Sequence, residues 1–459
     1  MPTRPPARIP AAPGAVPLIG HVWPLLRDPL AFLTSLPAYG DLLEIQAAGT
    51  RLVIACTPKL TWQILTDDRT FDRGGPLYQI AQQVAGTSIV TCGHDQHRRL
   101  RRLLQPAFHP KRISGYAHLM ADHIDARTSQ WRDGQVLDVQ PEMTTLTSTI
   151  IAETMFSTDM NASVRQHARH HVTDMIDTLW RQVVLPRWIV GDRCQQAGHR
   201  LRQTLAPLIT ARRAATHSAT ENQPTNQPPV PPAAVEHHDL LAALLHHQDV
   251  GEQPLTDKEI EDQVIGLFIA GTESTSTVLA WAIHHLTQNP ALRRELHREV
   301  DTVLAGAAAR PHHLPHLALT GQIITEVLRR HPTGWMLTRT TAHDTHLGDH
   351  PIPAGTNILY SPYLVHLTHR SDQPPGCPSH AFDPHRPPTP RNAFIPFGGG
   401  AHKCLGDRYA ITELTLALAT ITARWDLSGT PTGTRPRIGA ALKPPPHTIT
   451  LHRRQPHYR

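Results

Sequence analysis

A cysteine inside a glycine-rich segment, directly ahead of a predicted helix, constrains this chain more than any other feature. The segment Phe397–Gly406 reads FGGGAHKCLG, with the thiol at Cys404. Glycine adopts backbone angles that residues with a β-carbon resist, so Gly398 and Gly400 allow a loop to curl around a sulfur and direct backbone N–H groups at it. Apolar residues at helical spacing predict a buried helix over 407–424, whose N-terminal dipole favours a thiolate. The segment therefore predicts a thiolate that binds a metal, expected to be iron.

An isolated cysteine after glycines is more often a small buried hydrophobic residue than a ligand. Here Phe397, Gly400, His402, Cys404 and Gly406 occupy every defined position of F-x-x-G-x-[RH]-x-C-x-G. This pattern resembles the haem-binding signature of the cytochrome P450 family. The resemblance implies haem b (iron protoporphyrin IX) with Cys404 as the iron ligand. It places Phe397, His402 and Gly406, together with Gly398, against the cofactor.

The length and patterning of the chain bear on its fold class. At about 150 residues per domain, 459 residues would suggest about three domains. The resemblance implies instead one P450 domain over 1–459, mainly α with small β-sheets, and haem between a long oxygen-side helix and a proximal helix. The residue pattern predicts a hairpin over 42–55, and it predicts helices over the ranges 94–107, 111–132, 165–184, 196–213 and 257–286. A Pro-rich arm over 1–17 and a flexible Pro-rich loop over about 217–235 complete the organisation.

The charge and cysteine content indicate the compartment. Only five of the 44 basic residues are lysine, and the formal net charge is +6, which indicates a GC-rich genome more than a nucleic-acid partner. Five cysteines without C-x-x-C spacing suit a reducing cytoplasm. The N-terminal region lacks the run of ~20 apolar residues that would span a bilayer. We therefore expect a soluble, cytoplasmic protein without a membrane anchor.

A second motif, Ala270–Thr275 (AGTEST), lies within the long helix predicted over 257–286. Glycine and hydroxyl residues weaken a helix interior, so the motif predicts either a local opening against a ligand or a kink packed on a neighbour. It resembles the P450 oxygen-binding segment [AG]-G-x-[DE]-T-[TS], which places Ala270 and Gly271 against the haem. It also implies catalytic roles for Glu273, Ser274 and Thr275.

Ser274 departs from the family pattern, which usually has threonine at the position that donates a hydrogen bond to dioxygen. Serine keeps the hydroxyl but lacks the methyl that restricts the rotamer. Our hypothesis is that Glu273 and Ser274 deliver protons through water, with Thr275 able to share or assume the hydroxyl role.

A third motif is Glu326-Val327-Leu328-Arg329. A carboxylate and a guanidinium three residues apart share a helix face, and most such pairs lie on solvated surfaces. The resemblance implies a buried structural pair completed by Arg386, although His385 replaces the usual glutamate. We therefore expect Glu326, Arg329 and Arg386 to support the cysteine loop.

Haem propionates require cations. The resemblance nominates His97 and Arg101, four residues apart on a predicted helix, with Arg339 and His402. Each of the four would be an ordinary surface residue if taken alone. As a set they are expected to bind the propionates, because hydrogen bonds to charged groups are worth about 1.5–3 kcal/mol each.

No flavin, nicotinamide or iron–sulfur motif is present, so electrons are expected to come from a ferredoxin and an NAD(P)H-dependent ferredoxin reductase. A basic face would attract an acidic ferredoxin; its candidate residues are Arg98, Arg99, Arg102, Lys111, Arg112, Lys403 and Arg408. We expect a monomer that uses O2 and acts on a lipophilic small molecule.

The segments 71–90, 264–270 and 335–337 are predicted to line the substrate pocket, and their largely apolar composition suits a lipophilic substrate. The finer substrate class follows from resemblance alone. The segments 68–78, 335–339 and 358–363 resemble soluble actinobacterial terpene oxygenases of the pentalenene oxygenase type. This implies hydroxylation of a cyclic sesquiterpene or diterpene in secondary-metabolite (antibiotic) biosynthesis. A fatty acid, steroid or polyketide is the alternative substrate. A haem-thiolate gas sensor that performs no oxygenation is the alternative function.

Overall fold

The fold is known from a computed structural model that describes residues 8–47, 49–185, 187–221, 239–246, 255–368, 381–429 and 433–455. Its helices are α1 Val22–Arg27, α2 Pro29–Ser35, α3 Pro58–Thr66, α4 Pro76–Ala85, α5 His94–Leu104, α6 Pro110–Ser129, α7 Val139–Phe156, α8 Ala162–Val184, α9 Arg187–Val190, α10 Arg193–Glu221, α11 Leu240–His246, α12 Asp257–Gln288, α13 Pro290–Leu304, α14 Ala318–Arg330, α15 Pro362–Thr368 and α16 Asp407–Arg424. Its strands are β1 Leu42–Ala47, β2 Thr50–Ala55, β3 Phe71–Asp72, β4 Val136–Asp138, β5 Leu337–Thr341, β6 Thr345–Leu347, β7 His350–Ile352, β8 Asn357–Tyr360, β9 Trp425–Ser428, β10 Arg437–Ile438, β11 Leu442–Lys443 and β12 Thr448–Arg453. The predicted fold class, mainly α with small sheets, is confirmed.

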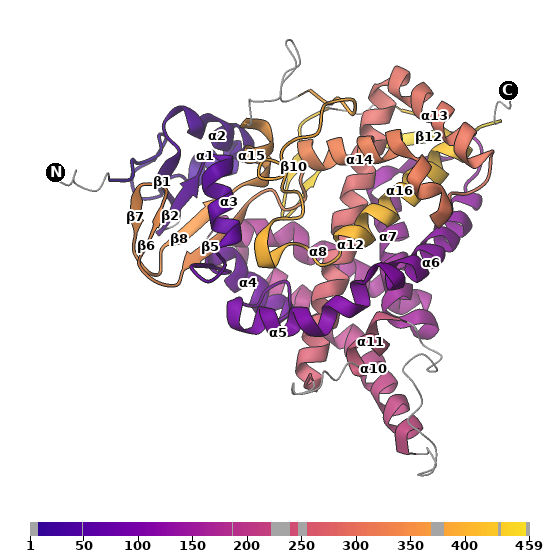
Figure 1. The fold of residues 1–459 in the computed structure, drawn as a ribbon, viewed down its shortest axis with the longest axis horizontal. Coiled ribbons are helices and arrows are strands. Elements are labelled where there is room, and N and C mark those ends of the chain that lie inside the picture. Colours follow the sequence, from indigo (N-terminus) through magenta and orange to yellow (C-terminus); the bar gives the residue numbers. More distant parts are fainter. Residues whose placement is uncertain are drawn as a thin grey trace.

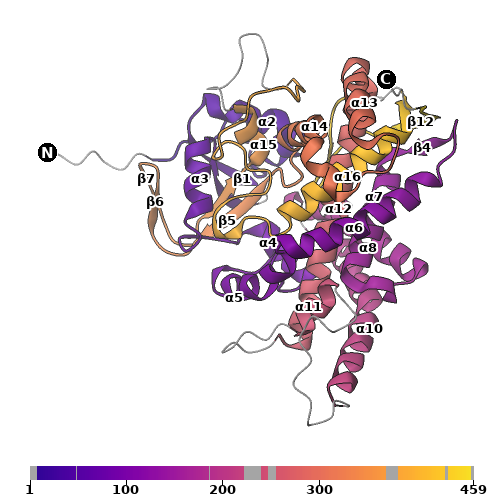
Figure 2. The same cartoon turned by 45° about the vertical axis from the view of Figure 1, so that its right-hand side comes forward.

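The molecule has a sheet-rich side and a helical side (Figure 1). The largest sheet has the strand order β1-β2-β8-β5-β3, in which β2 and β8 are parallel and the other pairs are antiparallel. The predicted hairpin is confirmed as β1 and β2, which pair Leu43 with Ile54 across the turn at Gly49. The turned view shows the same division, with α6, α7, α12 and α16 gathered away from this sheet (Figure 2).

Helix α12 runs through the middle of the helical side (Figure 1). It begins with a reciprocal capping box between Thr256 and Glu259, which satisfies backbone N–H groups at its first turn. It packs against α7 and α16. Its length and hydropathy would suit a membrane span, but 78% of its most apolar window is buried inside the protein. Helix α12 is thus a core helix, and it brings the AGTEST motif close to the helix that follows Cys404.

Two expectations about local structure need correction. Helix α12 continues without interruption through residues 270–275, so the predicted opening is absent from this helix. The hydroxyls preserve it by donating to carbonyls one turn back: Ser274 Oγ donates to Ala270 O at 2.7 Å, and Thr275 Oγ1 donates to Gly271 O at 2.9 Å.

Helix α10 also extends to Glu221, beyond the predicted loop start at about 217. The rest of that loop, like residues 1–7 of the arm, lies outside the described residues.

Gly271 has a packing role instead. A β-carbon at this position would lie 2.8 Å from Cδ1 and Cγ1 of Ile151 on α7. Real β-carbons essentially never approach so closely, so glycine is what lets α7 and α12 touch.

Candidate functional site

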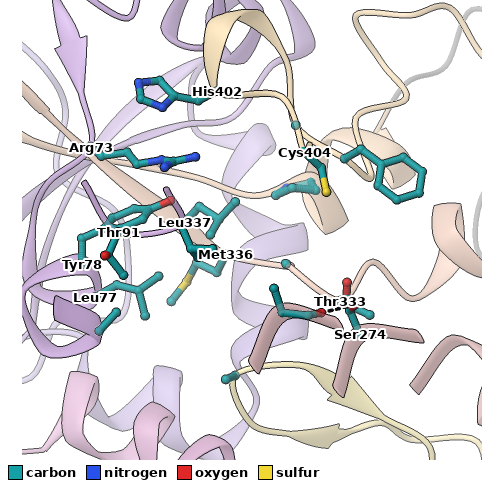
Figure 3. A pocket seen from close by; sticks show the side chains of 18 of the residues that line it. Arg73, Leu77, Tyr78, Thr91, Ser274, Thr333, Met336, Leu337, His402 and Cys404 are labelled. Carbon is teal, nitrogen blue, oxygen red and sulfur yellow. Dashed lines mark hydrogen bonds between the residues drawn. The ribbon is translucent and has the colours of Figure 1, made fainter. Parts of the chain in front are cut away.

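An internal cavity with a volume of about 530 Å³ separates the cysteine loop from α12. Figure 3 shows the sulfur of Cys404 pointing into this cavity, with Ser274 across from it. Thr275, Ala270 and Gly271 contribute further lining from α12. The structure therefore brings the cysteine and the hydroxyl motif, about 130 residues apart in sequence, to opposite walls of one cavity.

The cysteine loop has the tight geometry that its glycines predict. Gly398 and Gly400 have φ angles of 70° and 64°, which side chains with a β-carbon rarely adopt. A β-carbon at Gly400 would also collide with the carbonyl oxygen of Leu65 on α3. The N–H of Cys404 donates to the carbonyl of Phe397 at 2.8 Å, and α16 begins at Asp407. The loop thus places Cys404 just before a helix N-terminus, as predicted.

The protein environment of Cys404 has opposing effects on its thiol. Its accessible surface faces the cavity, and the surrounding protein raises its pKa by desolvation. The backbone N–H of Gly406 acts in the opposite direction, as do the charges of Arg101 and Lys403. These groups are arranged to stabilise a thiolate once a cation binds the sulfur.

Arginine and histidine side chains gather on the cavity wall beside the cysteine loop. The rings of His97 and His402 lie 4.0 Å apart, and both residues line the cavity with Arg339. Burial, together with the charges of Arg73 and Arg101, lowers the pKa of His97 to about 3, so the ring is neutral. Within the described ranges, Nδ1 of His97, both ring nitrogens of His402, and Nε and Nη1 of Arg339 are buried without hydrogen-bond partners.

Arg73 belongs to this cluster but escaped the sequence analysis. It lines the cavity, its charge lowers the pKa values of His97 and His402, and Figure 3 shows its side chain on the same side as His402. Its Nη1 group donates to Ile89 O, while its buried Nε has no partner in the described part of the chain. Arg101, by contrast, donates to the carbonyls of Ala401 and Lys403 at 3.2 and 2.5 Å, so it also braces the cysteine loop.

These residues fit the haem that the signature implies. Buried donors without acceptors are costly, and the guanidinium groups of Arg73 and Arg339 on one cavity wall favour anions, which the two propionates of haem would provide. Arg73, His97, Arg339 and His402 would bind the propionates, Cys404 would bind the iron, and Ala270 with Gly271 would face the opposite side of the ring. The glycine-lined loop leaves room for a flat group above Cys404.

Glu273 lies elsewhere than the other two proposed catalytic residues. Its side chain is buried, and one carboxylate oxygen lies 2.6 Å from Nζ of Lys443, which also binds Asp177 at 2.8 Å. Among the residues that line the cavity, Ser274 and Thr275 are present and Glu273 is not. Burial raises the pKa of Glu273, with Lys443 opposing this effect and Asp177 adding to it. Its route to the cavity therefore requires water or a side-chain rotation.

Glu326, Arg329 and Arg386 lie together behind the cysteine loop. The Nε and Nη2 atoms of Arg329 contact the two Glu326 oxygens at 2.6 and 2.7 Å, with both side chains about 95% buried. Arg386 Nε lies 3.8 Å from the same carboxylate. The carboxylate also accepts the N–H of Asp383 at 3.0 Å, so the pair fixes the segment that leads to the loop. His385, at the position of the usual glutamate, instead contacts the exposed Glu295 at 3.2 Å.

His366 connects this ion pair to the cysteine loop, and sequence reasoning missed it. Its Nε2 atom accepts the N–H of Ile395 at 2.9 Å, so Nδ1 carries the proton and donates to Arg329 O at 2.9 Å. Burial lowers the pKa of His366 to about 3, which keeps the ring neutral. One of many histidines in the sequence, it carried no distinguishing local signal.

The remaining cavity wall is mostly apolar. It comes from α4, α8, α12, the 89–91 segment and the approach to β5, and includes Leu77, Tyr78, Leu179, Val183, Leu267, Met336 and Leu337. Each of the three segments predicted to line a pocket, 71–90, 264–270 and 335–337, contributes residues to it, although Phe71 and Val264 lie outside the lining. The contribution of α8 was not predicted. Such a lining suits a lipophilic ligand.

Comparisons with known proteins point in the same direction as this geometry. The family model described as Cytochrome P450 matches residues 10–451. A pentalenene oxygenase from Streptomyces avermitilis is 38% identical over 434 residues, covering 92% of this chain and 91% of that protein.

Two proteins of Streptomyces melanosporofaciens are similarly related. A cyclooctat-9-en-7-ol 5-monooxygenase is 37% identical, covering 92% of this chain and 90% of its own length. A cyclooctatin synthase is 36% identical, covering 95% and 92%.

Proposed function

We propose that this chain, which belongs to the cytochrome P450 family, hydroxylates a C–H bond of a cyclic terpene. Membership makes it a haem-thiolate monooxygenase, an enzyme that uses O2, a redox partner and a lipophilic substrate. The gas-sensor alternative is therefore disfavoured. The observation that carries the proposal is the apolar cavity with Cys404 on one wall and the hydroxyls of Ser274 and Thr275 on the other.

The residues divide the work of the reaction. Bound haem b would supply the activation of O2, which a thiolate ligand promotes by donating electron density. Cys404 would hold the iron. Arg73 and Arg339 would neutralise the propionates, and the neutral rings of His97 and His402 would donate hydrogen bonds to them. Ser274 and Thr275 present hydroxyls to the cavity, while Glu273 is the nearby acid whose burial favours the protonated form. The apolar wall orients the substrate and excludes bulk water.

A terpene substrate is proposed because the cavity wall is apolar and the relatives are named for terpene substrates or products. Cyclic sesquiterpenes and diterpenes should convert the ferric enzyme from low spin to high spin, since an apolar ligand displaces water from the cavity. Titration monitored by absorbance measures this directly. Fatty acids, steroids and polyketides of similar size serve as the comparison set. Saturable shifts with those classes and none with terpenes would contradict the proposed substrate.

Ser274→Ala should lower the fraction of electrons that enter product and raise the fraction lost as peroxide. The variant removes a cavity-facing hydroxyl. It leaves the backbone of α12 in place, including the Ala270 carbonyl that accepts from this hydroxyl. Ser274→Thr is the matched control, because it restores the hydroxyl and adds the methyl that limits its rotamers. Product and peroxide are measured per NAD(P)H consumed. Full coupling in Ser274→Ala would assign the role to Thr275.

A ferredoxin, itself reduced by an NAD(P)H-dependent reductase, is the proposed electron donor. The chain is proposed to act as a monomer. Arg98, Arg102, Lys111, Arg112 and Arg408 are exposed on α5, α6 and α16 near the cysteine loop. Arg99 and Lys403, which contact Glu259 and Asp407, lie on the same face.

Reduction of the enzyme by ferredoxin should therefore slow as ionic strength rises, because salt screens attraction over about 8–10 Å. Stopped-flow reduction measures the rate. Reduction by dithionite is the control, since it needs no docking face. A ferredoxin rate that does not depend on salt would contradict docking at this face.

A further inference from the structure

One wall of the cavity comes from the 86–92 segment, which lies between α4 and α5 and has no regular secondary structure. Ile89, Val90 and Thr91 of this segment line the cavity, and Figure 3 shows Thr91 on the same side of the cavity as Arg73. Buried backbone groups that no helix or sheet satisfies must find other hydrogen-bond partners. The position of this wall therefore depends on the residues that supply those partners.

Gln263 on α12 supplies two of these hydrogen bonds. Its side chain is fully buried, with Oε1 accepting the N–H of Ile89 at 2.7 Å and Nε2 donating to the carbonyl of Thr87 at 3.2 Å. The preceding residue, Asp262, accepts the N–H of Thr87 at 3.0 Å. Two adjacent residues of one helix thus hold three backbone groups of the segment.

Glycines allow the segment to lie directly on α12. A β-carbon at Gly266, three residues after Gln263, would collide with the side chain of Ser88. A β-carbon at Gly86 would collide with the carboxylate of Asp262, and Gly86 also has a φ angle of 70°. Neither position accepts a larger residue without moving the segment. The close contact therefore fixes where the wall lies relative to α12.

The carbonyl of Ile89 is bonded in the opposite direction, toward the haem site. Arg73 Nη1 donates to it, and the guanidinium of Arg73 lies 5.9 Å from the ring centroid of Tyr78. Arg73 is one of the residues that fit the propionates, and its buried Nε has no partner within the described ranges. The backbone of Ile89 thus connects Gln263 on α12 to a guanidinium at the propionate side of the cavity.

We propose that Gln263 is a positioning residue that sets both the shape of the substrate-facing wall and the orientation of Arg73, through the backbone of Ile89. Gln263 is not among the residues that line the cavity, so it acts through Ile89 and not by touching the substrate. Without its side-chain amide, the N–H of Ile89 would be buried and unpaired, which is costly enough to displace the segment. Val90 would move with it, and the space open to a substrate would change.

This inference deepens the proposed function, because it names what selects among substrates of the monooxygenase. It rests on haem binding and on a substrate held in the cavity. It does not depend on the substrate being a terpene.

Resonance Raman spectroscopy of the substrate-free ferric enzyme tests the connection to Arg73 without turnover. Gln263→Leu has a similar volume but can form neither bond, so it should shift the propionate bending bands in the same direction as Arg73→Leu. Gln263→Glu should restore the wild-type bands. Burial favours the neutral acid, which can accept from the N–H of Ile89 and donate to the carbonyl of Thr87.

Gln140→Leu is the matched control. Gln140 on α7 also bonds to α12, with its Nε2 3.4 Å from Oγ of Ser276, but it does not line the cavity and makes no printed contact with the 86–92 segment. Its replacement should leave the propionate bands at their wild-type positions. A comparable shift in both leucine variants would mean that general loosening of α12, and not the bonds to Ile89, explains the Gln263 result.

Azole binding measures the shape of the wall without a terpene. Phenylimidazole binds ferric iron and places its phenyl ring in the substrate space, whereas imidazole is too small to reach the wall. Gln263→Leu should change the Kd of phenylimidazole several-fold and leave that of imidazole unchanged. With a substrate that induces the high-spin state, the variant should also alter the distribution of hydroxylated products and change KM more than kcat.

Wild-type propionate bands or wild-type selectivity between the two azoles in Gln263→Leu would overturn the proposal. A Gln263→Glu variant that behaves like Gln263→Leu would overturn it as well. If Gln263→Leu does not fold, Gln263→Asn decides, because it stays polar but is one methylene too short to reach Ile89. An absent spin shift with terpenes would contradict the proposed substrate and leave these measurements intact.

Discussion

Cys404→Ser is expected to reduce monooxygenase turnover by more than the ~100-fold typical of losing a residue that merely supports a metal ligand. The thiol is the one side chain of the cysteine loop positioned in the cavity as an iron ligand. A serine hydroxyl ionises far less readily and donates less electron density to iron, so O2 activation fails even where haem still binds. Product formation per bound haem measures the effect.

Cys194→Ser is the matched control for this substitution. Cys194 is equally a free thiol, but it is buried beside α8, where its sulfur lies 3.5 Å from Met175 O. A hydroxyl can make the same contact, so turnover should remain close to wild type. Comparable losses in both variants would mean that general destabilisation, and not ligand loss, explains the Cys404 result.

Arg329→Ala is expected to lower the free energy of unfolding by about 3–5 kcal/mol, because it leaves the buried Glu326 carboxylate without its bidentate partner. This is a large part of the ~5–15 kcal/mol that stabilises a typical protein. The change also removes the side-chain donors to Ala381 O and His366 O, although the Arg329 carbonyl that accepts from His366 remains. Haem content should therefore fall together with stability.

Denaturant unfolding and the haem-to-protein ratio measure both effects. Arg435→Ala is the control, since the pair between Arg435 and Asp28 is exposed and should contribute at most about 1 kcal/mol. Equal losses of unfolding free energy in the two variants would show that burial of the Glu326–Arg329 pair does not add to stability. Glu326→Gln should be less damaging than Arg329→Ala, because it leaves a neutral group behind.

The sequence predicted those features whose signal is local. The offsets within Phe397–Gly406 predicted the loop with its positive φ angles, and apolar spacing predicted α16 with the bounds that the structure shows. The hairpin of β1 and β2 was predicted from alternation around Gly49. In these cases neighbouring residues determine the conformation, so tertiary contacts were not needed to infer it.

Features that depend on tertiary contacts were missed or wrong. The expected opening at 270–275 assumed that hydroxyls weaken the helix, but each donates back to a carbonyl of the same helix. Arg73 became recognisable as a candidate for the propionates only when folding placed its charge close to His402. The partner of Glu273, Lys443, lies about 170 residues later, and no spacing rule links the two.

The central claim is that Cys404 binds haem iron as a thiolate, and the carbon monoxide difference spectrum of the reduced wild-type enzyme tests it most directly. Thiolate donation through iron should give the strongly red-shifted Soret band typical of this ligation, and Cys404→Ser should abolish that band. A wild-type band at the position of imidazole-ligated haem, or one that persists unchanged in Cys404→Ser, would contradict the account.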